Sequence, residues 1–129
     1  MNEIKIGSSV IVKGKPCFII AEAGVNHNGD VEMAKELVHA AKEVGADCVK
    51  FQTFKAERIA MHNAPKAKYQ LKTTDPTESQ IEMLKKLEMP ENAYHEIVEC
   101  CRKNKIVFLS TPYSKEDVDF LNKLGVPAF

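Results

Sequence analysis

Five polar side chains lie within or directly after short apolar runs of this 129-residue sequence. They are Glu22, Lys50, Gln52, Ser110 and Thr111. A carboxylate can act as a general acid or base, and ammonium, amide and hydroxyl groups can hold an anionic substrate such as a phosphate ester. These residue types would therefore suit acid/base chemistry on an anionic ligand, provided that the fold brings them together.

The runs that carry these residues have the composition of β-strands and alternate with helical patterns. Strands are expected at 17–21, 48–52 and 106–110, with a further strand beginning at 126–129. Two short β-prone runs at 4–6 and 10–12 predict a hairpin within residues 1–16. The run at 17–21 is apolar throughout, which predicts a strand covered on both faces.

Helical periodicity fills the intervals between the predicted strands. Asp30 suits the N-cap of a first helix, and Ser114 suits the cap of the last one. Thr77 and Gln80 have the spacing of a capping box before another helix, and a fourth helix is expected from about 91 to 103. Residues 53–76 are expected to form a long polar loop.

This alternation predicts a parallel sheet, which is compatible with a doubly wound domain or with the first part of a (β/α)8 barrel. Both folds carry their chemistry at the carboxyl ends of the strands. Because strand side chains alternate, Lys50 and Gln52 should point to one face and Val49 and Phe51 to the helix-covered face. The sequence ends within an apolar strand, so we expect 17–129 to be the first three βα units and the start of a fourth strand.

Glu22 and Lys50 have two interpretations. They could form a buried ion pair that only fixes packing, or they could bind a ligand at the loop-bearing end. The second is favoured because the polar groups gather at that end. His27 lies between Asn26 and Asn28 in a strand-to-helix loop, where a structural and a functional role are equally plausible.

Composition excludes several classes of protein. Lys plus Arg and Asp plus Glu both total 18, which argues against a general nucleic-acid or membrane-surface binder. No apolar stretch approaches the roughly 20 residues of a membrane span. The first residues do not resemble a secretory signal, so a cytoplasmic location is expected. The four cysteines are expected to be reduced and packed in the core, and the basic stretches 66–68 and 102–105 to be solvated surface.

Five strings of the sequence together resemble the N-acetylneuraminate synthase family, which includes legionaminate and related nonulosonate synthases. They are IAEAGVNHNGD (20–30), VKFQTFKAE (49–57), APKAKYQ (64–70), ESQIEMLKKLEM (78–89) and FLSTPYS (108–114). The resemblance implies a (β/α)8 barrel preceded by a hairpin and followed by an antifreeze-like domain that reaches the partner's active site in a homodimer. Most of the barrel and that domain would follow Phe129.

The same resemblance implies a reaction and roles for individual residues. The family joins C3 of phosphoenolpyruvate to the aldehyde carbon of N-acetylmannosamine or a related sugar. Glu22 matches an acid/base or electrostatic position, and the substrate-binding positions would be Lys50, Gln52, Ser110, Thr111, Tyr69, Asn26, His27 and Asn28. A divalent metal, Mn²⁺ or Mg²⁺, would polarise the aldehyde, and its ligands would lie beyond residue 129, with none in this chain.

Two other functions are compatible with the sequence. One is a non-catalytic carbohydrate-binding module, which would need no affinity for phosphate. The other is a deoxy-sugar-acid phosphate synthase on the same fold, which would need basic groups for a second phosphate, and the sequence offers no clear candidate for them.

Overall fold

A three-stranded parallel sheet forms the centre of the molecule. The computed structural model describes residues 3–60 and 65–129. β3 (Ile20–Gly24), β4 (Cys48–Thr53) and β5 (Val107–Pro112) pair in the order β3-β4-β5. Two short strands, β1 (Ile4–Ile6) and β2 (Ser9–Ile11), form a separate antiparallel pair. The first two residues of the hairpin expected at 1–16 lie outside the described residues.

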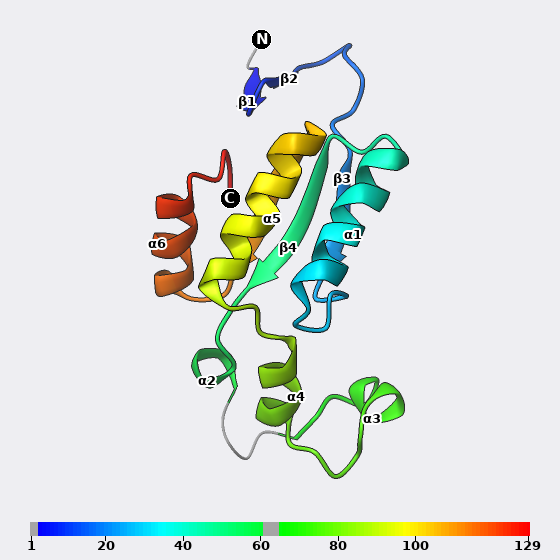
Figure 1. Ribbon diagram of the computed structural model, residues 1–129, viewed down its shortest axis with the longest axis vertical. Coiled ribbons are helices and arrows are strands. Elements are labelled where there is room, and N and C mark those ends of the chain that lie inside the picture. Colours follow the sequence, from blue (N-terminus) through cyan, green and yellow to red (C-terminus); the bar gives the residue numbers. More distant parts are fainter. Residues whose placement is uncertain (1–2, 61–64) are drawn as a thin grey trace.

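Six helices are described, and they occupy two regions around the sheet. They are α1 (Val31–Glu43), α2 (Ala56–Ile59), α3 (Gln70–Thr73), α4 (Gln80–Leu87), α5 (Glu91–Asn104) and α6 (Lys115–Leu124). α1, α5 and α6 lie alongside the strands, whereas α2, α3 and α4 lie beyond the carboxyl end of β4 (Figure 1). The core between sheet and helices includes Val49, Phe51, Phe108, Ile97 and Leu121. No helix in the described ranges is long and apolar enough to cross a membrane.

Side-chain caps mark the start of three of the six described helices, α1, α4 and α6. The Asp30 carboxylate accepts hydrogen bonds from the amides of Glu32 (2.7 Å) and Met33 (3.0 Å), and Ser114 caps α6, as predicted. The capping box predicted at Thr77 and Gln80 is wrong: it is formed by Ser79 and Glu82. Thr77 lies two residues before this cap, and its amide and hydroxyl both donate to Asp75 Oδ1, at 2.8 and 2.7 Å.

The first strand of the parallel sheet lies later than predicted. Its pairing begins at Ile20 opposite Cys48. Ile19 lies just before the strand, where its amide donates to the Asp47 carboxylate and its carbonyl accepts from the amides of Asp47 and Cys48. The expectation that this run is covered on both faces is also wrong, since Ile19 is 53% and Ile20 43% exposed. β3 is an outer strand of the described sheet and therefore lacks a neighbour on one side.

The strand expected to begin at 126–129 is likewise absent from the described residues. The amides of Gly125 and Val126 both donate to the carbonyl of Leu121, which closes the end of α6.

The expected loop at 53–76 contains two short helices, α2 and α3. Cys48 and Cys101 are buried as expected, but Cys17 is exposed and Cys100 half-buried.

Candidate functional site

The central parts of β3 and β4 bring Glu22 and Lys50 side by side. The two residues are paired in the strand register, and Lys50 Nζ lies 3.0 Å from Glu22 Oε2. Their side chains are 53% and 33% exposed, respectively. A pair exposed to this extent contributes at most about 1 kcal/mol to stability, so its main consequence is an accessible carboxylate and ammonium next to each other. Within the described residues this pair is therefore partly open to solvent.

The irregularity in β3 places Gly24 next to both Glu22 and Gln52. The register shifts between Glu22 and Gly24, and Gly24 has a positive φ of 56°. A Cβ on Gly24 would lie 3.6 Å from Glu22 Oε1 and 3.7 Å from Gln52 Nε2, so both polar groups approach this glycine. Gln52 is in turn paired with Thr111 of β5. Side chains on one face of adjacent strands thus gather Glu22, Lys50, Gln52 and Thr111.

Ser110 does not join this group. Its hydroxyl lies 2.6 Å from that of Thr53, and both residues are buried. Ser110 is paired with Phe51 and shares the helix-covered face of β5 with Phe108. The structure therefore separates Ser110 from Thr111, which is the next residue along the strand.

His27 forms part of the scaffold of the loop after β3. It is 1% exposed, and its Nδ1 accepts a hydrogen bond from the amide of Gly29 at 2.9 Å. Its ring packs against Phe51, with 6.0 Å between the ring centroids. Burial lowers the pKa of His27 and favours the neutral imidazole. Asn26 and Asn28 beside it are exposed, and Asn28 has a positive φ of 50°.

Tyr94 supports the end of β4 from the helix side, which the sequence patterns did not indicate. Its hydroxyl donates a hydrogen bond to the carbonyl of Gln52 at 3.0 Å. Burial raises the pKa of Tyr94 to about 12, so the hydroxyl stays protonated and able to donate. Because Tyr94 has the helical spacing of a core residue, only the tertiary contact reveals that it positions the backbone of a site residue.

The segments beyond the sheet are connected through α4 and its flanking residues. Glu88 accepts hydrogen bonds from the amide of Ala56 (2.6 Å) and from Lys55 Nζ (3.2 Å). Gly29 packs so closely on this region that a Cβ would lie 2.5 Å from the carbonyl oxygen of Lys86. The loop after β3 and the segment after β4 therefore both rest on the carboxyl end of α4.

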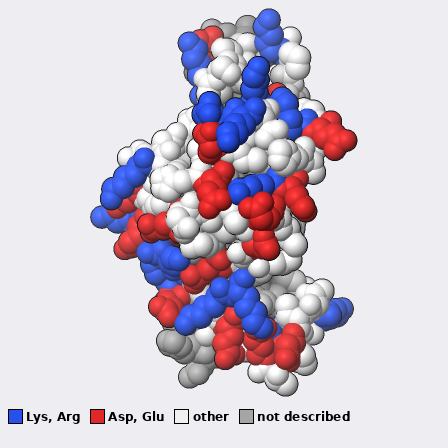
Figure 2. Space-filling view, viewed as in Figure 1, with Lys and Arg blue, Asp and Glu red and all other residues white. Residues whose placement is uncertain are grey.

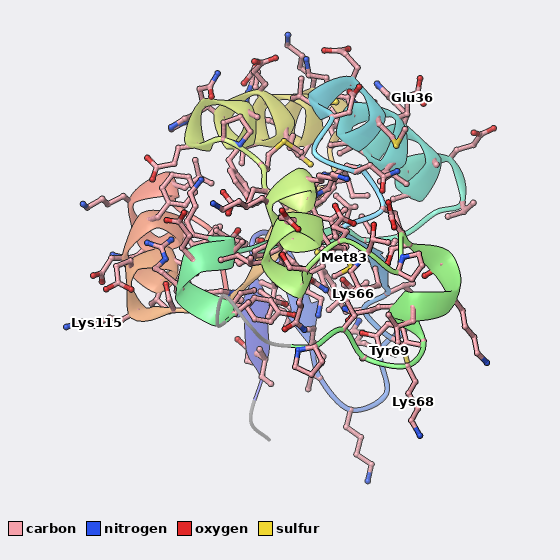
Figure 3. All side chains as sticks on the ribbon, turned by 90° about the horizontal axis from the view of Figure 1, so that it is seen from below. Glu36, Lys66, Lys68, Tyr69, Met83 and Lys115 are labelled. Atoms are coloured by element: carbon pink, nitrogen blue, oxygen red, sulfur yellow. The ribbon has the colours of Figure 1, made fainter. Side chains whose placement is uncertain are left out.

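Tyr69 and Lys66 lie in the segment that leads to α4. Tyr69 precedes α3 and is 70% exposed, whereas the side chain of Lys66 is 1% exposed. Seen from the carboxyl end of the sheet, Lys66 lies towards the middle of the molecule and Lys68 projects outward (Figure 3). The expectation of solvated surface at 66–68 is therefore wrong for Lys66. Ala64, the first residue of the string 64–70, lies outside the described residues.

Charge is mixed over the face shown in Figure 2, where basic and acidic side chains alternate without a large patch of either sign. Within the described residues, no group of three or more His, Cys, Asp or Glu side chains could hold a metal ion. The site assembled here is therefore a carboxylate beside an ammonium, an amide and a hydroxyl.

A sequence model of the NeuB family matches residues 37–129, which is most of the chain. The chain belongs to the NeuB family. It is 52% identical to the N,N'-diacetyllegionaminic acid synthase of Campylobacter jejuni over 115 residues, which are 89% of this chain and 34% of that protein. It is 37% identical to the N-acetylneuraminate-9-phosphate synthase of Homo sapiens over 118 residues, 88% of this chain and 32% of that protein.

Solved structures show the same arrangement of elements as this NeuB chain. The N-acetylneuraminic acid synthetase of Leptospira borgpetersenii, in complex with citrate, superposes with a TM-score of 0.76 at 27% identity, over 97% of this chain and 39% of that one. The spore coat polysaccharide biosynthesis protein SpsE of Bacillus subtilis gives 0.74 at 33% identity, over 99% and 32%. This chain spans about a third of the length of the curated relatives it matches.

Proposed function

We propose that the protein is a nonulosonic acid synthase that condenses phosphoenolpyruvate with an N-acyl amino sugar. Membership of the NeuB family supports this class of reaction. The observation that carries it is the accessible pair of Glu22 and Lys50 on adjacent parallel strands, with Gln52 two residues nearer the carboxyl end of β4. In this proposal the chain supplies the first part of a (β/α)8 barrel in a cytoplasmic homodimer.

The reaction forms one C–C bond, and at C2 it replaces the C–O bond to phosphate with a C–O bond to the oxygen of water. C3 of phosphoenolpyruvate attacks the aldehyde carbon of the sugar, whose oxygen takes up a proton, and water adds at C2 with loss of a proton. The resulting intermediate expels phosphate and leaves a ketone at C2. The reaction thus needs a group that gives or takes protons, and donors that hold the carboxylate and phosphate of the substrate.

The four gathered side chains match these needs. Glu22 would exchange protons with the aldehyde oxygen or the attacking water, or stabilise the charge that develops there. Lys50 supplies a cation beside that carboxylate, and Gln52 and Thr111 add an amide and a hydroxyl for anionic oxygens. Asn26, Asn28 and Tyr69 are proposed as contacts to the sugar, and Ser110 and His27 would act only through the backbone that they hold in place.

The proposal includes a divalent metal, Mn²⁺ or Mg²⁺, whose ligands lie outside this chain. The residues described here do not form a site for it, since no cluster of three metal-binding side chains occurs among them. Glu22 is already paired with Lys50. The chain's own residues would therefore serve in substrate binding and proton transfer.

The proposed function is tested by assaying the whole protein for phosphate released from phosphoenolpyruvate. We expect release only when an N-acyl amino sugar is present, and an N,N'-diacetylated sugar should be tried alongside N-acetylmannosamine because of the relatives' names. With ¹⁸O-labelled water, the label should enter the sugar acid and not the phosphate. Sugar binding without phosphate release would instead support a carbohydrate-binding module.

Glu22→Gln tests the role of the carboxylate. The amide keeps the shape of the side chain but cannot exchange the proton, so kcat in the whole protein should fall roughly 100-fold or more while both KM values change little. Glu36→Gln is the matched control, because Glu36 is exposed on α1, and it should retain full turnover. Unchanged kcat in Glu22→Gln would remove this residue from the mechanism.

A further inference from the structure

A thiol and an imidazole meet where α1 packs beside α5 (Figure 1). His39 Nε2 lies 3.8 Å from Cys100 Sγ, a distance at which a hydrogen bond to sulfur can form. One turn earlier along both helices, Lys35 Nζ donates to the Glu96 carboxylate at 2.8 Å and ties the two helices together. The fold therefore holds the thiol and the imidazole opposite each other.

The sulfur of Cys100 has a second polar neighbour on its own helix. Asn104 Nδ2 lies 3.6 Å from Cys100 Sγ and also donates to the Cys100 carbonyl at 2.8 Å. A neutral imidazole can accept the proton of a thiol, and both the resulting imidazolium and the amide of Asn104 can donate to a thiolate. The thiolate is the nucleophilic form of cysteine. Cys100 thus has a proton acceptor and two potential donors around its sulfur.

The other three cysteines lack this combination of access and a neighbouring base. Cys48 and Cys101 are buried, and burial raises the pKa of each thiol to about 12, so both stay protonated near neutral pH. Cys17 is exposed, but no residue of the described ranges forms a hydrogen bond with its sulfur. Cys100 is half-buried and touches an imidazole. The four thiols therefore differ in the two properties that determine reactivity.

A hollow of about 460 Å³ opens beside Cys100, and this volume is within the range of sites that bind small molecules. The two carboxylates in its lining already have partners, since Glu96 pairs with Lys35 and Glu99 pairs with cations of its own helix. His39 is thus the base that contacts the sulfur. A small reactant has room to approach the thiol from the hollow.

We propose that Cys100 is a modification site at which the protein forms a mixed disulfide with a small disulfide compound. His39 takes the proton from the thiol, and the thiolate attacks one sulfur of the compound. One S–S bond forms and one breaks, and the departing thiolate takes the proton from His39. The disulfide compound is the only co-reactant that this exchange requires. The inference does not depend on the proposed synthase activity.

Exposure of the reduced whole protein to glutathione disulfide near neutral pH tests the site. Peptide mass spectrometry follows the modified fraction of each cysteine over time. We expect Cys100 to react about 10-fold faster than Cys17, although Cys17 is the more exposed residue, and Cys48 and Cys101 to stay unmodified in the folded protein. A rate at Cys100 no greater than that at Cys17 would overturn the proposal.

His39→Gln separates the contribution of the imidazole from that of exposure. His39 is exposed, so the substitution should leave the fold intact, but glutamine cannot take up the thiol proton. The rate at Cys100 should fall about 10-fold while the rate at Cys17 stays the same. His95→Gln is the matched control, because His95 is exposed on another side of α5, five residues before Cys100, and it should alter neither rate. An unchanged rate at Cys100 in His39→Gln would contradict the proposed proton transfer.

Discussion

At the residue scale, the loop after β3 depends on a neutral histidine. Burial lowers the pKa of His27 below its ordinary value of 6.5, and its Nδ1 is occupied as an acceptor by the Gly29 amide. Below pH 6.5 the unfolded chain therefore binds a proton that the folded chain resists. His27 contributes its full stability above pH 6.5, and that contribution is lost as the pH falls from 6.5 towards the lowered pKa.

Urea unfolding between pH 7.5 and 5.5 measures this effect. The free energy of unfolding should fall with decreasing pH by up to about 1.4 kcal/mol per unit from this one group. His27→Gln should reduce the change in the free energy of unfolding per pH unit. His95→Gln alters an exposed residue on α5 and should leave that change as it is. Equal slopes in all three proteins would show that His27 is not the group responsible.

Strand alternation explains which site residues the sequence could predict. Lys50 and Gln52 are two residues apart on β4 and share a face, as expected, and the register adds Glu22 and Thr111. Ser110 directly precedes Thr111 and so cannot share that face in a regular strand, although both were expected at the site. The role of Tyr94 could not be predicted, because its partner is a backbone carbonyl 42 residues away.

At the scale of elements, α4 depends on its cap. Ser79 Oγ accepts from the Glu82 amide, and the Glu82 carboxylate accepts from the Ser79 amide at 2.8 Å. Ser79→Ala should therefore lower stability by about 1 kcal/mol. Thr77→Ala should cost less, because the Thr77 amide still donates to Asp75. The two substitutions can be compared by amide exchange within α4, and a larger effect from Thr77→Ala would contradict the observed cap.

Helix ends were easier to predict than strand ends for a physical reason. Asp30 and Ser114 cap their helices through contacts two or three residues away, which a local pattern contains. The start of β3 is determined by its pairing with β4. The contact between Ile19 and Asp47 that precedes this pairing joins residues 28 positions apart, so no local pattern encodes the register. Residues 126–129 have strand-like composition, but in the described chain no strand pairs with them.

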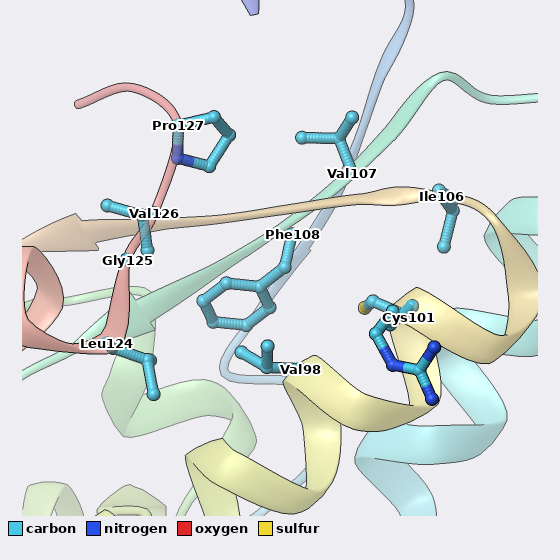
Figure 4. A pocket seen from close by; sticks show the side chains of 10 residues that line it. Val98, Cys101, Ile106, Val107, Phe108, Leu124, Gly125, Val126 and Pro127 are labelled. Atoms are coloured by element: carbon cyan, nitrogen blue, oxygen red, sulfur yellow. The ribbon is translucent and has the colours of Figure 1, made fainter. Parts of the chain in front are cut away.

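At the scale of the whole molecule, the described sheet has two outer strands with apolar surface beside them. A hollow of about 280 Å³ lies between β5, α5 and the residues after α6, lined by Val98, Phe108 and Val126 among others (Figure 4). A second, of about 220 Å³, lies beside β3 and α1 and is lined mainly by alanine, leucine and valine side chains. Unpaired strand edges next to apolar surface favour association with another polypeptide segment, such as a second copy of this chain.

The 129-residue chain on its own should therefore self-associate. Size-exclusion chromatography with light scattering should show dimers or larger species whose proportion rises with concentration. Ile20→Lys places a charge on the outer strand β3 and should reduce association, because a lysine at a sheet edge opposes pairing. Ile4→Lys is the matched control, since Ile4 is similarly exposed but lies in the separate β1–β2 pair. A monodisperse monomer that unfolds cooperatively would contradict this prediction, because it would show that the three-stranded sheet is stable without another strand paired at its edges.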